Sequence, residues 1–258
     1  RLVKDYGIGY LKMDYNIEPG IGTEFTADSA GDGLLEHERA YLSWLDNVYM
    51  RYPDLVIENC SSGGLRMDYA MLSRYSIQST SDQEDYRRYA TIAANAPAAL
   101  TPEQAAVWAY PLSHEDKEET VFNMVNALLL RIHLSGQLTE LSKERTTLIK
   151  EALDYYKMIR EDIRSAVPFW PLGLSKYIDP WACLGLITGN KIYLAVWRRN
   201  SETDSSILPI PILAGKQVTV TCAYPQYKHC TYEWNTGASS LAVQLPKQYT
   251  ARLFELDF

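Results

Sequence analysis

Several features that would assign the chain to a specialised class are missing from its sequence. No apolar run approaches the roughly 20 residues of a membrane-spanning helix, so we expect no membrane partner. Basic residues are outnumbered, 25 to 32, and form no stripe, which gives a formal net charge of −7. This balance argues against a nucleic-acid partner. Neither a signal peptide nor a transit sequence is recognisable at the start.

Cysteine is also scarce. The chain has four, and they form no CxxC pair and have no histidine at a metal-binding spacing. We therefore expect no metal site. Cys222 and Cys230 could meet across a hairpin, but nothing in the pattern requires a bond between them. We interpret Cys60, Cys183, Cys222 and Cys230 as mostly reduced thiols.

The 258 residues are 47% hydrophobic and 22% charged, a composition typical of a globular protein with one large core or with a large and a small domain. The first residue is Arg rather than Met, and a strand follows almost at once. We therefore interpret the chain as a piece of a longer protein.

Strand and helix patterns alternate in the first part of the chain. Short apolar strands are predicted at residues 8–13, 55–57 and 75–78, and a helix with apolar residues at helical spacing is predicted at 34–52. Each strand ends in polar side chains. This order predicts an α/β fold in which parallel strands bring their polar ends to one face.

Further along, helices are predicted at residues 86–95, 118–136 and 143–165, with a short strand at 107–111. After about residue 172 the apolar pattern changes to a period of two. We predict strands at 192–197, 218–222, 241–245 and 249–256. The expected domains are therefore residues 1–172 and an antiparallel β-sandwich at 173–258.

Candidate site residues follow the three early strands. Lys12, Asp14 and Asn16 alternate with bulky neighbours, so a strand would point all three to one side. Barrel enzymes keep catalytic groups at such strand ends, although a polar strand end entering a turn has the same pattern. The next strand leads into Cys60-Ser61-Ser62-Gly63-Gly64, which also reads as a tight turn, and the third leads into Thr80-Ser81-Asp82.

Two neighbouring features have ordinary structural readings. Asp82 precedes a predicted helix and could serve as its N-cap. Arg66 and Asp68 are expected to form an ion pair with each other.

Three motifs in this order resemble those of α-galactosidases of family GH36 and their clan relatives. Residues 12–16, KMDYN, are similar to the K-W-D-x-N signature, and residues 60–68, CSSGGLRMD, are similar to C-S-S/G-G-G-G-R-F-D. Residues 80–85, TSDQED, resemble the family's W-T-S-D-x-x-D stretch. Met13 and Ser79 stand where the family often has Trp, and Leu65 stands where it has Gly.

The resemblance implies the C-terminal portion of a (β/α)₈ TIM barrel, beginning near the fourth strand, followed by an antiparallel β-sandwich. It implies that Asp14 is the nucleophile and Asp82 the general acid/base of a retaining glycosidase. Lys12, Asn16, Cys60, Ser62 and Gly63 would bind the sugar. The implied substrates are α-galactosyl oligosaccharides such as raffinose or melibiose, with no metal or cofactor.

Other readings stay open at this point. The chain could belong to an α-N-acetylgalactosaminidase or another α-glycosidase of the clan, or it could be a non-catalytic carbohydrate-binding or assembly fragment. A half-barrel has open sheet edges, so we expect a homo-oligomer or pairing with the absent first part of the barrel. Relatives of this kind imply a bacterial-type cytoplasmic location.

The chemistry needs two carboxyl groups roughly 5–5.5 Å apart, one ionised and one protonated. We expect the Lys12 charge to favour ionised Asp14. The negative charges of Glu84 and Asp85 should favour the protonated form of Asp82.

Overall fold

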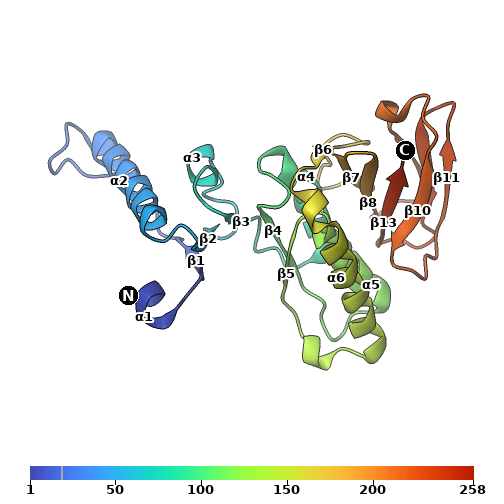
Figure 1. The fold of residues 1–258 in the computed structure, drawn as a ribbon, viewed down its shortest axis with the longest axis horizontal. Helices are drawn as coiled ribbons and strands as arrows, with labels where there is room; N and C mark the ends of the chain where they lie inside the picture. Colours follow the sequence, from blue (N-terminus) through green and yellow to red (C-terminus); the bar gives the residue numbers. More distant parts are fainter. Residues whose placement is uncertain (19) are drawn as a thin grey trace. The chain divides into compact units, whose positions relative to one another are not determined.

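The computed structural model describes residues 1–18 and 20–258. The chain folds into two compact units, Arg1–Thr80 and Ser81–Phe258. Figure 1 shows the elements of both units. None of the helices in the described residues is long and apolar enough to cross a membrane.

The first unit is built on three parallel strands. Strand β1 pairs with β2, and β2 pairs with β3, so the carboxyl ends of all three lie at the same edge. Asp14 stands opposite Cys60, and Asn59 stands opposite Gln78. The elements are α1 (Leu2–Tyr6), β1 (Tyr10–Asp14), α2 (Ala30–Arg51), β2 (Val56–Cys60), α3 (Tyr69–Leu72) and β3 (Ile77–Ser79).

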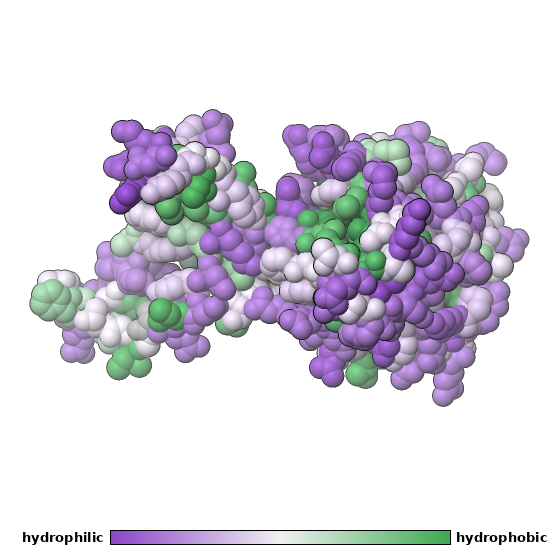
Figure 2. All heavy atoms as spheres, turned by 90° about the horizontal axis from the view of Figure 1, so that it is seen from below, coloured by the Kyte–Doolittle hydropathy of each residue, from purple (hydrophilic) through white to green (hydrophobic). Residues whose placement is uncertain are grey.

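The core of this unit is small. Leu11 and Met13 on the inner side of β1 pack against it, together with one face of α2. Its fully buried members are Leu45, Leu55, Ile57, Met71 and Tyr75. Apolar side chains also reach the surface of the unit, as Figure 2 shows.

The second unit begins with helices packed on a parallel strand pair. Local capping signals set where these helices start: Asp85 caps α4, Asp116 forms a capping box with Glu119 on α5, and Ser142 caps α6. The elements are α4 (Tyr86–Asn95), β4 (Ala105–Ala109), α5 (Lys117–Leu128), β5 (Arg131–Leu134) and α6 (Lys143–Ile163).

The predicted helix at 118–136 is wrong in its second half. Helix α5 ends at Leu128, and β5 follows and pairs in parallel with β4. The run Leu128-Leu129-Leu130 is buried throughout and fits a helix and a strand equally well. The pairing of β5 with β4, which local sequence does not encode, decides between them.

The rest of the second unit is an antiparallel β-sandwich. One sheet has the order β10-β13-β8-β7-β6 and the other has the order β11-β12-β9. Side chains from both sheets form one core, which includes Val196, Leu208, Leu241 and Phe254. The strands are β6 (Val167–Phe169), β7 (Trp181–Thr188), β8 (Lys191–Arg198), β9 (Ser205–Pro209), β10 (Thr219–Tyr224), β11 (Thr231–Asn235), β12 (Ser240–Gln244) and β13 (Thr250–Asp257).

The α/β fold class with a C-terminal antiparallel sandwich is thus confirmed. The division of domains between residues 172 and 173 stays a prediction. Strand β6 already belongs to the antiparallel sheet, because Val167 pairs with Ile187 of β7.

Candidate active site

The carboxyl edge of β1 displays the predicted polar face. Exposed and partly buried residues alternate along the strand, so Lys12 and Asp14 lie on its exposed side while Leu11 and Met13 face the core. Asn16 continues the alternation and is exposed. The strand thus presents a cation, a carboxylate and an amide in a row.

Lys12 has a partner that the motif did not reveal. Its Nζ lies 3.4 Å from Oε1 of Glu58, which is directly opposite on β2 and only 1% exposed. The hydroxyl of Tyr10 donates to the other oxygen of the same carboxylate. Glu58 therefore fixes the Lys12 ammonium at the sheet surface beside Asp14. Only the register of β1 with β2 identifies it.

Asn16 holds the turn that follows β2. Its Oδ1 accepts hydrogen bonds from the backbone N–H of Ser62 at 2.8 Å and from the Ser62 hydroxyl at 3.2 Å. Ser62 has φ 44° and Gly63 has φ 83°, a left-handed pair that favours glycine at the second position. Lys12, Asp14, Asn16 and Ser62 are thus assembled at one edge of the sheet.

A buried amide network supports this turn from below. Asn59 donates to Oε1 of Gln78 at 2.7 Å and to the carbonyl of Arg66 at 3.0 Å. Gln78, which is fully buried, donates in turn to the carbonyl of Gly63 at 3.2 Å. Gln78 is a supporting residue that the sequence analysis missed. The available signal was a polar side chain at the end of the strand predicted at residues 75–78.

Cys60 belongs to the same face of the sheet as Lys12 and Asp14, because side chains at paired positions of neighbouring strands point to the same side, but it is covered there. It is 1% exposed and stands opposite Asp14 in the register. Burial raises the pKa of its thiol, so the side chain stays neutral and apolar. Cys60 therefore shapes the floor beneath the Ser62–Gly63 turn.

The predicted Arg66–Asp68 ion pair is wrong for the described residues. Arg66 pairs with Glu38 at 3.8 Å and donates to the carbonyls of Tyr15 at 3.2 Å and Ile17 at 3.0 Å. Asp68 caps α3 by accepting from Ala70 and Met71. Since α3 begins right after Asp68, the carboxylate accepts hydrogen bonds from the first turn of that helix.

Asp82 belongs to the second unit and is exposed. The predicted cap role is wrong: Asp85 caps α4 by accepting from the N–H of Arg87 at 2.9 Å. The Ser81 hydroxyl accepts from Gln83 N–H at 3.1 Å and shapes the intervening turn. The carboxylate of Asp82 therefore does not serve as the cap of α4.

Tyr110 is an aromatic neighbour of Asp82 that the motifs did not include. Burial raises the pKa of its phenol, and the negative charges of Glu84 and Asp82 raise it further. The ring stacks on Trp108 with centroids 6.0 Å apart, and Trp108 contacts His133 edge-on at 5.0 Å. A protonated phenol and an aromatic surface therefore lie close to this carboxylate.

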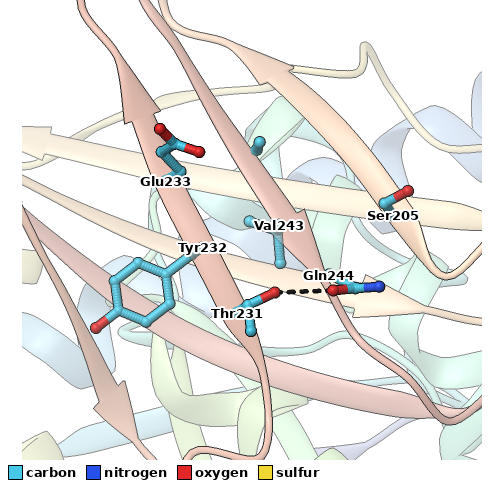
Figure 3. Close-up of a pocket in the computed structure, with 7 residues that line it drawn as sticks. Ser205, Thr231, Tyr232, Glu233, Val243 and Gln244 are labelled. Carbon is cyan, nitrogen blue, oxygen red and sulfur yellow. Dashed lines mark hydrogen bonds between the residues drawn. The ribbon is translucent and has the colours of Figure 1, made fainter.

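A separate hollow lies on the exposed face of the three-stranded sheet (Figure 3). It measures about 380 Å³ and is lined by polar and apolar residues from three strands. The hydroxyl of Thr231 donates to Oε1 of Gln244 at 2.9 Å across it. Glu233 is its single carboxylate, whereas glycoside hydrolysis needs a pair.

Comparison with known proteins gives a consistent picture. The family model described as Melibiase matches residues 1–166. No curated protein sequence matches the chain significantly. Among solved structures, the galactosidase domain of the α-galactosidase-sucrose kinase AgaSK superposes with a TM-score of 0.76 at 18% identity, and covers 97% of this chain and 34% of its own.

Two further structures are similar over nearly the whole chain. The GH36 α-galactosidase AgaA from Geobacillus stearothermophilus, in complex with raffinose, has a TM-score of 0.74, with 16% identity over 99% of this chain and 36% of its own. An α-galactosidase from Lactobacillus brevis has a TM-score of 0.76, with 12% identity over 99% and 36%. The chain therefore spans about a third of the length of the structures that it matches.

Proposed function

Because the chain belongs to the Melibiase family, we propose that it forms part of a retaining glycoside hydrolase that removes terminal α-galactosyl groups from oligosaccharides. The observation that supports this most is the exposed row Lys12, Asp14 and Asn16 at the carboxyl edge of parallel strands. Raffinose- and melibiose-like sugars are the proposed substrates. Two carboxylates, Asp14 and Asp82, supply the chemistry.

Asp14 is the proposed nucleophile. Its carboxylate attacks the anomeric carbon and forms a glycosyl ester while the bond to the leaving oxygen breaks. The Lys12 ammonium, held in place by Glu58, stabilises negative charge on this face. A water molecule then cleaves the ester and releases galactose.

Asp82 is the proposed general acid/base. It gives a proton to the leaving oxygen in the first step and takes one from the attacking water in the second. The capping of α4 by Asp85 supports this assignment, because the carboxylate of Asp82 is then not needed as the helix cap.

The sugar hydroxyls are proposed to bind along the same edge. Both bonds from Ser62 occupy Oδ1 of Asn16, which leaves its Nδ2 to donate to a hydroxyl. Lys12 donates from the same face, while Cys60, Ser62 and Gly63 border the sugar. Leu65, 76% exposed directly after this turn, is where an N-acetyl group would find apolar contact, which keeps α-N-acetylgalactosaminidase as the second candidate.

The test is hydrolysis of a panel of aryl α-glycosides by the full-length protein and by its Asp14→Asn variant. We expect turnover of the α-galactoside, and a loss of about 10³-fold or more in the variant because the nucleophile is removed. Asp54→Asn is the matched control. Asp54 is an exposed carboxylate of the same unit, before β2 at its amino end, and its variant should retain full activity.

Three outcomes separate the alternatives. Turnover of only the N-acetylated substrate would keep the mechanism and change the sugar. Equal losses in Asp14→Asn and Asp54→Asn would contradict the role of Asp14. A folded protein that binds galactosides but turns none over would favour a carbohydrate-binding fragment.

A further inference from the structure

Two thiols that are not part of the proposed sugar site lie in contact in the β-sandwich. Cys222 is buried in β10, and Cys230 is partly exposed immediately before β11. Their Sγ atoms are 3.9 Å apart and share a hydrogen bond. The loop between the two strands folds back so that residues eight positions apart meet.

We propose that Cys222 and Cys230 form a reactive dithiol site, which takes a small disulfide of the glutathione class and is converted to an intramolecular disulfide. The site does not depend on the sugar chemistry, because all of its groups lie within the sandwich and the helices packed on it. Three features of the structure support it: a cavity, a cationic neighbour and a difference between the two thiols.

A cavity of about 390 Å³ opens onto Cys230. Lys117, Lys247, His229 and Arg252 contribute to its lining, together with the carboxylate of Glu118. A cavity of this size admits a peptide-sized reagent. The three cations of its lining, each also paired with a carboxylate, are placed to contact the carboxylates of a glutathione-type disulfide. Cys230 is thus the thiol that an incoming disulfide reaches first.

Arg252 places a fixed positive charge beside this thiol. The guanidinium is 1% exposed and is held by Glu118 in a two-point ion pair of 2.9 and 3.1 Å. It also donates to the carbonyl of Lys228, two residues before Cys230. Its position is therefore set by helix α5 and by the loop itself.

The two thiols differ in acidity. The hydrogen bond shared with Cys222 lowers the pKa of Cys230; burial opposes this, and the Arg252 charge lowers the pKa further, so the net direction is downward. The bond to Cys230 and burial raise the pKa of Cys222. Cys230 is thus the attacking thiolate and Cys222 the resolving thiol.

The reaction is a double exchange. The Cys230 thiolate attacks one sulfur of the small disulfide, whose S–S bond breaks and releases one thiolate that takes up a proton. Cys222 then loses its proton and attacks Sγ of Cys230, which expels the second small thiol. Two protein thiols are oxidised and one small disulfide is reduced to two thiols.

Closing this bond would tie the loop that joins the sandwich to two helices. Tyr224 donates to the carbonyl of Leu148 on α6 at 3.2 Å, and Tyr227 donates to Glu118 on α5 at 2.7 Å. Both tyrosines lie between the two cysteines. Oxidation is therefore expected to stabilise the contact of this loop with the helices.

The test is incubation of the whole chain with oxidised glutathione at neutral pH, followed by acid quenching, maleimide labelling of free thiols and peptide mass mapping. We expect a Cys222–Cys230 disulfide without retained glutathione. Cys60 and Cys183, each 1% exposed, should remain free and act as internal controls. In Cys222→Ser, glutathione should stay attached to Cys230, because the resolving thiol is gone.

Two further variants test whether the reaction is specific to this pair of thiols. Cys183→Ala removes another buried thiol of the sandwich and should leave the oxidation unchanged. If Cys222→Ser fails to fold, as judged by circular dichroism, Cys222→Ala replaces it. The proposal is overturned if wild-type Cys230 stays fully labelled, if Cys183 reacts as fast as Cys230, or if the folded Cys222 variant retains no adduct.

Discussion

Asp82, the proposed general acid/base, does not cap helix α4, because the neighbouring carboxylate of Asp85 does. Other single side chains also position their neighbours at the proposed site. Glu58 positions Lys12, and Asn16 uses one end of its amide to hold Ser62 while the other end points to no protein acceptor among the described residues. The proposed chemistry depends on these pairings more than on the motif residues alone.

The Asp82→Asn variant of the full-length protein should distinguish substrates by their leaving groups. An oligosaccharide leaves as an alkoxide that needs a proton, so its hydrolysis should fall by roughly 10²–10⁴-fold. A nitrophenolate leaves without one, so glycosylation from a nitrophenyl α-galactoside should fall much less. Burst-phase kinetics with both substrates measures the difference.

The neighbouring carboxylate provides the control. Glu84→Gln removes a negative charge beside Asp82 without removing the proposed acid, and should keep the same ratio between the two substrates. An equal loss on both substrates in Asp82→Asn would contradict proton donation by Asp82.

At the scale of elements, the start of α5 depends on one aspartate. Asp116 accepts from the N–H of Glu119 at 2.9 Å, while the Glu119 side chain accepts from the N–H of Asp116. Lys247 donates to the same carboxylate at 2.9 Å. Burial alone would raise the pKa of Asp116, but the bonds from Glu119 and Lys247 outweigh it and lower the pKa below its ordinary 3.8.

Asp116→Ala should therefore destabilise the chain by about 1 kcal/mol at neutral pH, the usual loss for an N-cap. Because the folded-state pKa is depressed, this contribution is complete above about pH 5 and is lost as pH falls through the folded value, below 3.8. Urea unfolding at pH 7 and near pH 3 measures it.

An amide at the same position is the control for this cap. Asp116→Asn keeps an acceptor for the helix and should lose less stability, with a smaller change between the two pH values. A loss in Asp116→Ala that stays constant down to pH 3 would contradict the ionised cap.

At the scale of the whole molecule, burial is unevenly shared between the two units. Helix α2 has 22 residues, of which Gly33 and Leu45 are buried. Helix α5 is shorter, yet every residue from Thr120 to Leu128 is buried. Local opening costs less free energy where fewer apolar contacts are lost, so the first unit should be the less stable one.

Hydrogen exchange of the 258-residue chain should show this difference. We expect the amides of α2 to exchange faster than those of α5. Helix α6 is a comparison of nearly equal length to α2, with 21 residues, and buries more of them. Its central amides should exchange more slowly than those of α2. Equal protection of α2 and α6 would contradict the argument.

The sequence by itself determined whatever depends on a few neighbouring residues. Helix α4 runs from Tyr86 to Asn95 as predicted, and α6 begins at Lys143 as predicted, where Ser142 caps it. The polar ends of the early strands were predicted for the same reason: alternation along one strand fixes which side chains share a face.

Tertiary structure decided everything that needed a distant partner. Ser62 is bound by Asn16 across 46 positions, Arg66 pairs with Glu38 instead of Asp68, and the leucine run after α5 leads into a strand only because β4 is there to pair with it. The sequence allowed Cys222 and Cys230 to meet but did not require it, and the fold of the loop brings their sulfurs together. The local sequence pattern determines which side chains share a face of a strand or helix. Long-range pairing determines which of these side chains contact one another, because such contacts form only once the chain has folded back on itself.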